Sequence, residues 1–520
     1  MTKDTGIAAR RMLERIGQNH SLRIADWGLG IAKNAMILTE LFAPAFQGRA
    51  NETALEWACQ EYTFGDLERR ANRMASALAA RGVTAGDRLA IILSNRIEYL
   101  DLFLAAARLG VIVVPINILY REREAGHILR DSQPKALVDA GTAPVQSDVP
   151  IWQVDELTAE ARIGGATAAH IPLNGDTPAA LIYTSGTTGA AKGAIITHGN
   201  LAANALTLVD AWRITADDRL LLALPLFHVH GLGNGIHCWL RSACRMRLLE
   251  RFDHAAAAAT LLDFRPTLFF GVPTMYVRLL DVDAASARNI GRSLRLAVSG
   301  SAPLAPQILS EFERLYGQRI LERYGMTETL MTLSNPYDGE RRAGTVGFPL
   351  PGVETRIVDD SGADVATGTV GELMVKTPTL CAGYWSQPEL TAMAFKDGWF
   401  RTGDLAKRSD DGYYTLCGRR SDLIISGGFN IYPREIEELL GEHPAVAEVA
   451  VAGMADRVRG EVPVGFVVRA EHADASAADL IEFCRSRLAS FKVPRAIHFV
   501  EQLPRTALGK VQKAALVNGL

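Results

Sequence analysis

The feature that most restricts the fold of this chain is an alternation of short apolar runs with helix-patterned segments. Residues 88–93 form an apolar run typical of a buried strand, residues 98–109 have the pattern of a helix, and residues 111–114 form a second run that ends before Pro115. This order predicts a βαβ unit, in which two parallel strands share a sheet and the helix packs against it.

Three later segments repeat the strand pattern. They are the runs 219–224, 267–270 and 294–298, and each is followed by a loop that contains Gly or Pro. Loops at the ends of the strands are where open parallel sheets bind ligands. We therefore expect a large N-terminal domain of βαβ-type sheets that holds a site at these loops.

After Gly352 the pattern changes to shorter strands separated by turn residues. The final part of the chain combines both patterns, with helices expected at 433–440 and 477–488 and strands at 446–451 and 464–468. The sequence thus predicts an α/β fold: a large N-terminal domain of βαβ-type sheets plus a β-rich subdomain, with a small mobile α+β C-terminal domain. We expect the domains to be 1–418 and 419–520, with a hinge at 419–421, and residues 1–50 carry no supporting motif.

Composition excludes several classes of protein. The chain has 520 residues, 48% of them hydrophobic and 22% charged, so it is long enough for more than one hydrophobic core. Its formal net charge of -3 argues against a protein that binds nucleic acid by charge alone. Six cysteines are scattered without a C-x-x-C pair, which argues against a disulfide framework and against a structural zinc site.

The same residues predict a location. The N-terminus lacks the continuous apolar core of a secretory signal, and the most apolar early segment, 91–118, contains too many charges for a membrane span. We therefore expect a cytoplasmic protein with no transmembrane segment and no nucleic acid partner. The sequence leaves the oligomeric state open.

The stretch YTSGTTGAAKG, residues 183–193, is the clearest functional signal. Its glycines let the backbone approach a polyanion, while Thr and Ser hydroxyls and Lys192 supply donors and charge. A Walker A loop requires G-x-x-x-x-G-K-[ST], and Gly186 and Gly189 do not have that spacing to the lysine. We interpret the stretch as a phosphate-binding loop of another kind; the alternative is an ordinary Gly- and Thr-rich linker.

Three further stretches carry groups suited to a nucleotide. ERYGMTET, residues 322–329, combines an aromatic ring, hydroxyls and a carboxylate, the mixture needed to cover an adenine, bond a phosphate and hold Mg²⁺. TGD, residues 402–404, places a carboxylate where it can bond ribose hydroxyls, and PRTALGK, residues 504–510, presents a lysine on a Gly-containing hairpin. Each stretch is weak evidence alone, because carboxylates near glycines commonly cap turns.

These motifs, with PLFHVHG at 225–231 and TGDLAKRSDDGYYTLCGRRSDLIISGG at 402–428, resemble in order and spacing the core motifs of the adenylate-forming superfamily. That superfamily includes acyl-CoA synthetases, luciferases and the adenylation domains of peptide synthetases. The resemblance extends from about residue 62 to the C-terminus. It implies an enzyme that uses ATP and Mg²⁺ to convert a carboxylate into an acyl-adenylate and pyrophosphate, after which the thiol of coenzyme A displaces AMP.

The resemblance also implies roles for particular residues. Lys510 would bridge the attacking carboxylate and the α-phosphate, Glu328 and Thr184 would hold Mg²⁺, and Gly427 and Gly428 would line the tunnel for coenzyme A. The implied catalytic residues are Lys510, Glu328, Thr184 and His228. The implied nucleotide site consists of Thr184, Ser185, Gly186, Thr187, Thr188, Gly189, Lys192, Tyr324, Gly325, Met326, Thr327, Asp404, Arg419 and Lys510.

The stretches GVPTMYVR, residues 271–278, and VSGSAP, residues 298–303, are expected at the acyl pocket. An arginine directed into an apolar pocket is costly without a partner, and a dicarboxylate would supply that partner through a forked ion pair. The motifs are most similar to those of malonyl-CoA synthetases. That resemblance implies that Arg278 and Ser301 contact the free carboxylate of the substrate and that His228 and His230 border the acyl site.

Several alternatives stay open from the sequence. Arg278 can point outward on its helix, in which case the chain would be a medium-chain fatty or aryl acyl-CoA ligase. A carrier-protein-loading adenylation enzyme and a non-catalytic nucleotide-binding relative are further alternatives. The sequence does not separate malonate, methylmalonate and monocarboxylic acids as substrates.

Overall fold

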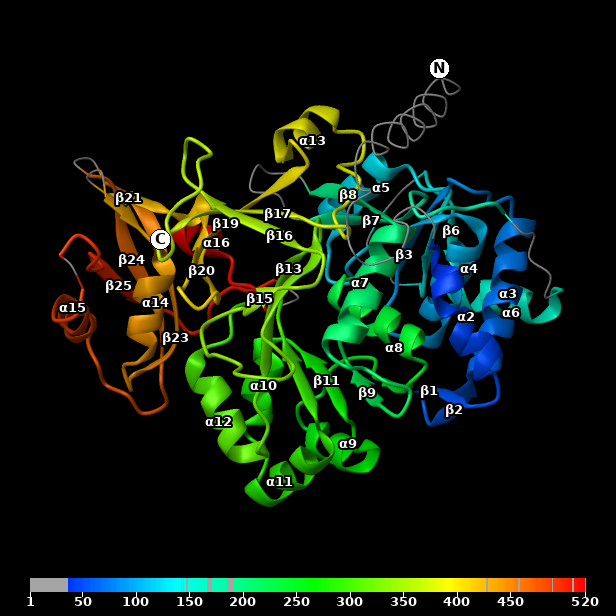
Figure 1. The fold of residues 1–520 in the computed structure, drawn as a ribbon, viewed down its shortest axis with the longest axis horizontal. Helices are drawn as coiled ribbons and strands as arrows, with labels where there is room; N and C mark the ends of the chain where they lie inside the picture. The colour runs from blue at the N-terminus through cyan, green and yellow to red at the C-terminus, as the bar shows by residue number, and fades with distance from the viewer. Residues whose placement is uncertain are drawn as a thin grey trace.

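The computed structural model describes residues 36–141, 143, 145, 148–165, 171–184, 191–426, 429–456, 459–488, 490–506 and 509–519. In this part of the chain the strands form four sheets, one of nine strands, one of six and two of five. Figure 1 shows that the chain runs from sheets and helices on the right, through a central region, to a smaller C-terminal part on the left. The fold is the α/β fold expected from the sequence.

The six-stranded sheet contains the predicted βαβ unit. β3 (Arg88–Ile92) and β4 (Ile112–Pro115) are parallel and are connected by α4 (Ile97–Leu109). The order of strands is β6 (Ile151–Gln153), β5 (Ala136–Asp139), β3, β4, β7 (Pro178–Thr184) and β8 (Lys192–Thr197). β7 and β8 pair antiparallel, so that Thr184 lies opposite Lys192.

The nine-stranded sheet has the order β15 (Phe348–Pro349), β14 (Leu330–Ser334), β13 (Leu321–Met326), β12 (Leu296–Ser299), β11 (Leu268–Gly271), β9 (Arg219–Leu222), β10 (Arg245–Leu248), β1 (Thr53–Trp57) and β2 (Gln60–Thr63). The strands from β13 to β1 in this order pair in parallel. Their carboxyl ends therefore lie at one edge of the sheet, where the loops after β9, β11 and β12 meet.

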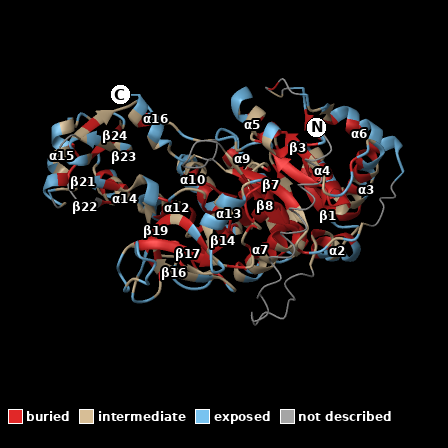
Figure 2. Cartoon of the chain, turned by 90° about the horizontal axis from the view of Figure 1, so that it is seen from above, coloured by how far each residue is buried: buried red, intermediate tan, exposed pale blue. Residues whose placement is uncertain are grey.

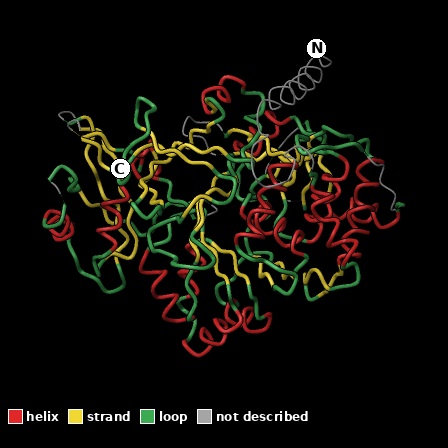
Figure 3. Tube along the Cα trace, viewed as in Figure 1, coloured by secondary structure: helices red, strands yellow, loops and turns green. Residues whose placement is uncertain are grey.

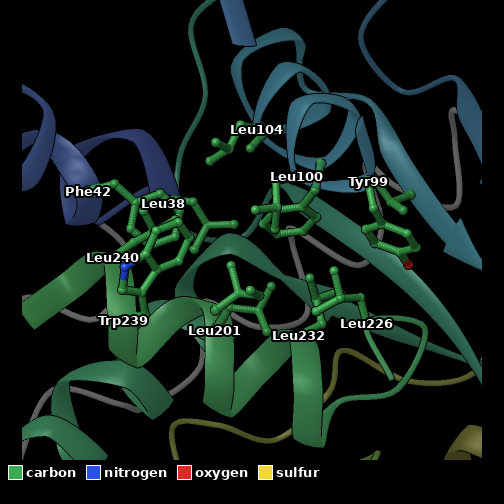
Figure 4. Close-up of a cluster of buried hydrophobic side chains, with 14 of the residues drawn as sticks. Leu38, Phe42, Tyr99, Leu100, Leu104, Leu201, Leu226, Leu232, Trp239 and Leu240 are labelled. Atoms are coloured by element: carbon green, nitrogen blue, oxygen red, sulfur yellow. The ribbon is translucent and has the colours of Figure 1, made fainter. Parts of the chain in front are cut away.

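Helices pack the two large sheets into one core. The helices are α2 (Leu38–Gly48), α3 (Phe64–Ala80), α7 (His198–Ala211) and α8 (His237–Ser242), together with α4. Figure 4 shows Leu38 and Phe42 of α2 beside Trp239 and Leu240 of α8, and the indole nitrogen of Trp239 donates to the Ala54 carbonyl at 3.1 Å. Figure 2 shows that the strands of both sheets lie in the buried interior.

Helix α3 begins with a capping box at Thr63. The Thr63 hydroxyl accepts a hydrogen bond from the backbone of Asp66 at 3.0 Å, and the Asp66 carboxylate accepts one from the backbone of Thr63 at 2.9 Å. This reciprocal capping box satisfies two amides that have no partner within the helix. The apolar face of the helix, formed by Leu67, Ala71, Met74 and Leu78, is buried.

Another group of helices encloses a second hydrophobic cluster. These are α9 (Ala257–Phe264), α10 (Pro273–Leu279), α11 (Ala284–Ser293) and α12 (Pro306–Tyr316). Tyr276 of α10 is fully buried there, and its hydroxyl donates to the Val298 carbonyl at 2.8 Å. This bond ties α10 to β12, whose carboxyl end leads into the VSGS loop.

The predicted β-rich subdomain is a five-stranded sheet of β16 (Glu354–Val358), β17 (Gly371–Lys376), β18 (Phe395–Lys396), β19 (Trp399–Arg408) and β20 (Tyr414–Arg419). All pairs in it are antiparallel. The tube in Figure 3 shows these strands between the helix-rich N-terminal part and the C-terminal part. The β19–β20 pair places Asp404 opposite Arg419.

The C-terminal part has the predicted mixture of helices and strands. Its elements are β21 (Ile424–Ser426), β22 (Phe429–Ile431), α14 (Pro433–Gly441), β23 (Val446–Asp456), β24 (Gly460–Arg469), α15 (Ala477–Arg485), β25 (Ala496–Phe499) and α16 (Lys513–Asn518). α15 ends at Arg485 and not at residue 488 as predicted. The predicted hinge coincides with the end of β20 and with the 3-10 turn η2 (Arg420–Asp422).

The remaining helices are α5 (Glu122–Ser132), α6 (Val154–Ile163), α13 (Pro388–Ala394) and the π-helix η1 (His230–Ile236). All six cysteines are free, as expected from their spacing. Among the described residues, no helix has the length and apolar character that crossing a membrane requires.

Candidate active site

A cavity of about 880 Å³ lies at the carboxyl ends of the parallel strands and is bordered by the C-terminal segment. The sequence-predicted residues that line it are Thr184, Lys192, His228, His230, Ser301, Gly325, Met326, Thr327, Glu328, Arg419 and Lys510. The predicted residues Ser185, Gly186, Thr187, Thr188, Gly189, Gly427 and Gly428 lie outside the described residues. One cavity thus combines motifs from distant parts of the chain.

Glu328 and Thr184 meet in this cavity. The Thr184 hydroxyl donates to Oε1 of Glu328 at 3.4 Å, and the Tyr384 hydroxyl donates to the same oxygen at 3.0 Å. Glu328 is 5% exposed, and burial raises its pKa above the ordinary value. A buried carboxylate next to a hydroxyl supplies the oxygen ligands that Mg²⁺ prefers, so these residues fit the predicted metal role.

Tyr384 also lies close to the lysine of the phosphate-loop motif. The Nζ atom of Lys192 is 5.9 Å from the centre of the Tyr384 ring. Tyr384 therefore contacts both the cation and the carboxylate of the site. Tyr384 was not predicted from the sequence, because it belongs to none of the motifs.

Asp404 is held in place by two partners. It accepts a hydrogen bond from the Tyr324 hydroxyl at 2.5 Å, and its other oxygen is 2.9 Å from Nε of Arg419. Burial raises the pKa of Asp404, while the Arg419 charge opposes the rise. The prediction placed Tyr324 in the nucleotide site. In the structure its ring packs in a hydrophobic cluster with Leu333 and Phe400, and its hydroxyl orients Asp404.

Lys510 reaches the cavity from the C-terminal hairpin. Its backbone amide donates to the Thr506 hydroxyl at 3.2 Å, and a Cβ added to Gly509 would lie 3.3 Å from Thr274 of α10. The side chain is exposed to the open cavity, yet partial desolvation by the walls, followed by repulsion from Arg419, lowers its pKa. The attraction of Asp404 opposes that shift. The lysine thus reaches the nucleotide part of the site.

Two histidines and a serine form another wall. Nδ1 of His230 is 3.2 Å from the Ser301 hydroxyl, and the backbone amide of His230 donates to Nδ1 of His228 at 3.1 Å. Ser301 has φ of 71°, a left-handed conformation that non-glycine residues seldom adopt and that is common at functional sites. Burial lowers the pKa of His228 to about 3 and that of His230 well below its ordinary value, so both rings are neutral at pH 7.

Arg323, which was not predicted as a site residue, is the cation of this wall. It lines the cavity and is 4% exposed, and none of the described residues forms a hydrogen bond or ion pair with its guanidinium. Its Nε and Nη2 atoms are enclosed without a partner. Burial lowers the pKa of Arg323 to about 9, which still leaves it charged at neutral pH.

Gly300 makes room for this guanidinium. A Cβ added to Gly300 would lie 2.3 Å from Cζ of Arg323, closer than any real contact. The guanidinium of Arg323 in ERYGMTET therefore occupies space that only a glycine in the VSGS stretch leaves free. Both residues lie in motifs that the sequence predicts at the site. The sequence alone does not show that Gly300 and Arg323 contact each other.

The structure does not place Arg278 on the cavity wall, so its contact with the substrate stays a prediction. Arg278 is exposed. The reason is the phase of α10, because Tyr276 and Leu279 are the residues that enter the hydrophobic cluster. The position two residues after Tyr276 then lies on the opposite side of the helix.

The hinge segment is tied to the β-rich subdomain by a charged cluster. Arg420 is 2.6 Å from Asp360 and 3.2 Å from the buried carboxylate of Glu372, measured between side-chain nitrogen and oxygen atoms. The Ser421 hydroxyl donates to Asp422 at 3.1 Å. These contacts fix the direction in which the chain enters its C-terminal part.

The fold and this combination of polar groups define an enzyme that activates carboxylates with a nucleotide. Residues 42–385 match the family model described as AMP-binding enzyme, and residues 435–510 match the AMP-binding enzyme C-terminal domain. The chain belongs to the AMP-binding, adenylate-forming enzyme family and is an ATP-dependent acyl-CoA ligase. The two matches lie on either side of the predicted boundary at residues 418 and 419, which stays a prediction.

Individual relatives cover nearly the whole chain. An indoleacetate-CoA ligase of Aromatoleum aromaticum is 36% identical over 481 residues, covering 89% of this chain and 94% of the relative. A malonate-CoA ligase of Arabidopsis thaliana is 33% identical over 550 residues, covering 92% and 89% respectively. The crystal structure of ATP-bound MatB from Rhodopseudomonas palustris is 39% identical with a TM-score of 0.87, covering 93% of this chain and 99% of that one.

Proposed function

We propose that this ligase activates a short dicarboxylate, with malonate as the best candidate, and forms malonyl-CoA, AMP and pyrophosphate. The observation that carries the proposal is the guanidinium of Arg323 in the cavity wall, which has no hydrogen-bond or ion-pair partner in the part of the chain that the structure describes. The similarity to a malonate-CoA ligase supports malonate among the dicarboxylates.

The physical argument concerns the cost of a buried charge. A charged group removed from water destabilises the protein unless a partner compensates it. The neighbouring His228 and His230 are neutral and supply no negative charge. A second carboxylate on the substrate would form a forked ion pair with Arg323, whereas an alkyl or aryl tail would leave the charge unpaired.

Ser301 and His230 complete the proposed carboxylate site. Their hydrogen bond of 3.2 Å places a hydroxyl and an imidazole on the same wall as Arg323. In this arrangement the hydroxyl of Ser301 can donate to the substrate while His230 Nδ1 orients it. Arg278 has no part in the proposed site, since it faces outward.

At the other carboxylate the proposed chemistry is charge stabilisation. Lys510 would stand between the attacking carboxylate and the α-phosphate, where negative charge grows in the transition state. Asp404, oriented by Tyr324 and Arg419, would bond the ribose hydroxyls, and Thr327 would bond the α-phosphate. Lys192 and Thr184 would hold the outer phosphates.

Mg²⁺ would be held by Glu328 and Thr184. When bound, the ion neutralises charge on the phosphate oxygens. The contribution of this chain is to keep a carboxylate and a hydroxyl 3.4 Å apart on one wall. The thiol of coenzyme A would accept the acyl group from the acyl-adenylate. The roles of Gly427 and Gly428 in the tunnel for coenzyme A stay predictions.

The test is the formation of AMP from ATP in the presence of coenzyme A with a panel of acids. Malonate, methylmalonate, succinate, octanoate, benzoate and indoleacetate are compared at equal concentration. The proposal predicts that malonate or methylmalonate has the highest kcat/KM, by about 100-fold over the monocarboxylates, the value of a charged hydrogen-bonded pair. A higher value for octanoate, benzoate or indoleacetate would identify a fatty or aryl acyl-CoA ligase and contradict the dicarboxylate assignment.

A further inference from the structure

Helix α5 lies beside the β7–β8 hairpin that carries Thr184 and Lys192 (Figure 1). His127 and Asp131 are four residues apart on this helix, so they share one face. No motif includes either residue. Each of them nevertheless contacts the hairpin next to one of the two cavity residues.

His127 contacts the β8 side of the hairpin. Its Nε2 atom donates to the Ala191 carbonyl at 2.8 Å, directly before Lys192. A carbonyl oxygen only accepts, so the proton is on Nε2. The imidazole also meets the Tyr183 ring edge-on, with ring centres 6.4 Å apart.

Asp131 contacts the β7 side. Its carboxylate accepts a hydrogen bond from the Tyr183 hydroxyl at 2.5 Å, directly before Thr184. Burial, followed by this hydrogen bond, raises the pKa of Tyr183, so its hydroxyl stays protonated and donates. The backbone carbonyl of Asp131 accepts a second bond, at 3.2 Å, from the indole nitrogen of Trp385, whose own amide donates to Gly193.

We propose that His127 and Asp131 are positioning residues that hold Thr184 and Lys192 at the distance and orientation needed to bind the outer phosphates of ATP. The two bonds connect Tyr183 and Ala191 to the same helix. Each cavity residue is adjacent in sequence to a bonded residue, so loss of a bond displaces it directly. The proposal rests on the proposed role of Thr184 and Lys192 in phosphate binding.

The test compares the binding of ATP and AMP to the full chain by calorimetry. The first variant, His127→Leu, removes the hydrogen bond to Ala191. The second variant, Tyr183→Phe, removes the hydroxyl that donates to Asp131 and keeps the aromatic ring. AMP lacks the outer phosphates and serves as the internal reference. We expect each variant to weaken ATP binding about five-fold, the effect of one hydrogen bond, with AMP affinity unchanged.

Two controls separate positioning from general damage. His127→Gln retains a side-chain N–H that can donate to Ala191 and is expected to restore most of the ATP affinity. Arg123→Leu places the same leucine on an exposed position of α5 and is expected to leave the affinity for both nucleotides unchanged. Unchanged ATP affinity in both His127→Leu and Tyr183→Phe would overturn the proposal, and so would an equal loss for ATP and AMP.

Lys192→Ala distinguishes this inference from the phosphate assignment on which it rests. If Lys192→Ala weakens ATP binding while the two bond-deleting variants do not, only the positioning role fails. If Lys192→Ala also leaves the ATP affinity unchanged, the phosphate assignment itself is wrong.

Discussion

Two of the cations that line the cavity, Arg323 and Lys510, have different surroundings. Arg323 is enclosed and has no acidic partner among the described residues, whereas Lys510 is exposed to the open cavity and near Asp404. A buried guanidinium suits a static contact with a carboxylate, because it stays charged and offers a fixed fork of donors. An exposed ammonium on a hairpin suits a catalytic role, because it can approach the reacting atoms.

Lys510→Ala is expected to lose acyl-adenylate formation by at least about 100-fold, because it removes charge stabilisation in the transition state. The melting temperature should not change, because the side chain is exposed. Pyrophosphate release measures the first half-reaction directly. Lys407→Ala, an exposed position outside the cavity, is the matched control, and near-normal pyrophosphate release by the Lys510 variant would refute the role.

Gly300→Ala is expected to lower kcat/KM for malonate by about ten-fold or more, since the new Cβ would displace the Arg323 guanidinium. The KM for ATP should stay constant, because the change does not touch the phosphate side. Gly48→Ala adds the same methyl group where no atom lies within 4 Å and should have no effect on either constant. A lower kcat/KM for malonate together with a higher KM for ATP would show general misfolding instead.

The helices of the main core contain two histidines that the chemistry does not use. His198 of α7 accepts from the backbone of Leu38 at 3.2 Å, and His237 of α8 donates to the Leu232 carbonyl at 2.6 Å. Nε2 of each ring is buried without a partner among the described residues. Burial lowers the pKa of both histidines to about 4 from an ordinary value of 6.5, so neither ring is protonated in the folded state at neutral pH.

These histidines predict acid sensitivity of the core. Below pH 6.5 the unfolded chain binds protons that the folded chain does not, so the free energy of unfolding falls as the pH falls from about 6.5 to 4. Each histidine contributes at most about 1.4 kcal/mol per pH unit. Melting temperatures measured across this range should fall less steeply for His237→Gln than for the unchanged chain, while the exposed control His472→Gln keeps the original slope. Identical slopes in all three proteins would exclude this origin.

Across the whole molecule, the sequence predicted the architecture better than the direction of single side chains. The βαβ unit, the β-rich sheet and the C-terminal mixture all follow local periodicity and turn residues. The motifs also predicted much of the cavity wall, because several of them, such as VSGS and ERYGMTET, lie at the ends of parallel strands. Periodicity and strand ends are local properties, so they can be recognised in a single sequence.

Contacts between distant segments were not predictable in this way. The direction of Arg278 depends on the rotation of a short helix, and that rotation is set by the burial of Tyr276 and Leu279. The fit of Gly300 to Arg323 needs the spacing of two neighbouring strands. The support of the hairpin by α5 joins residues of two segments without a shared motif.

The most direct test of the dicarboxylate assignment compares malonate with isovalerate, in which two methyl groups replace the distal carboxylate oxygens. The measurement is kcat/KM for each acid with the unchanged chain, Arg323→Leu and Arg278→Leu. We expect the unchanged chain and Arg278→Leu to prefer malonate by about 100-fold, and Arg323→Leu to lose that preference. A malonate preference that survives in Arg323→Leu, or that disappears in Arg278→Leu, would contradict the assignment.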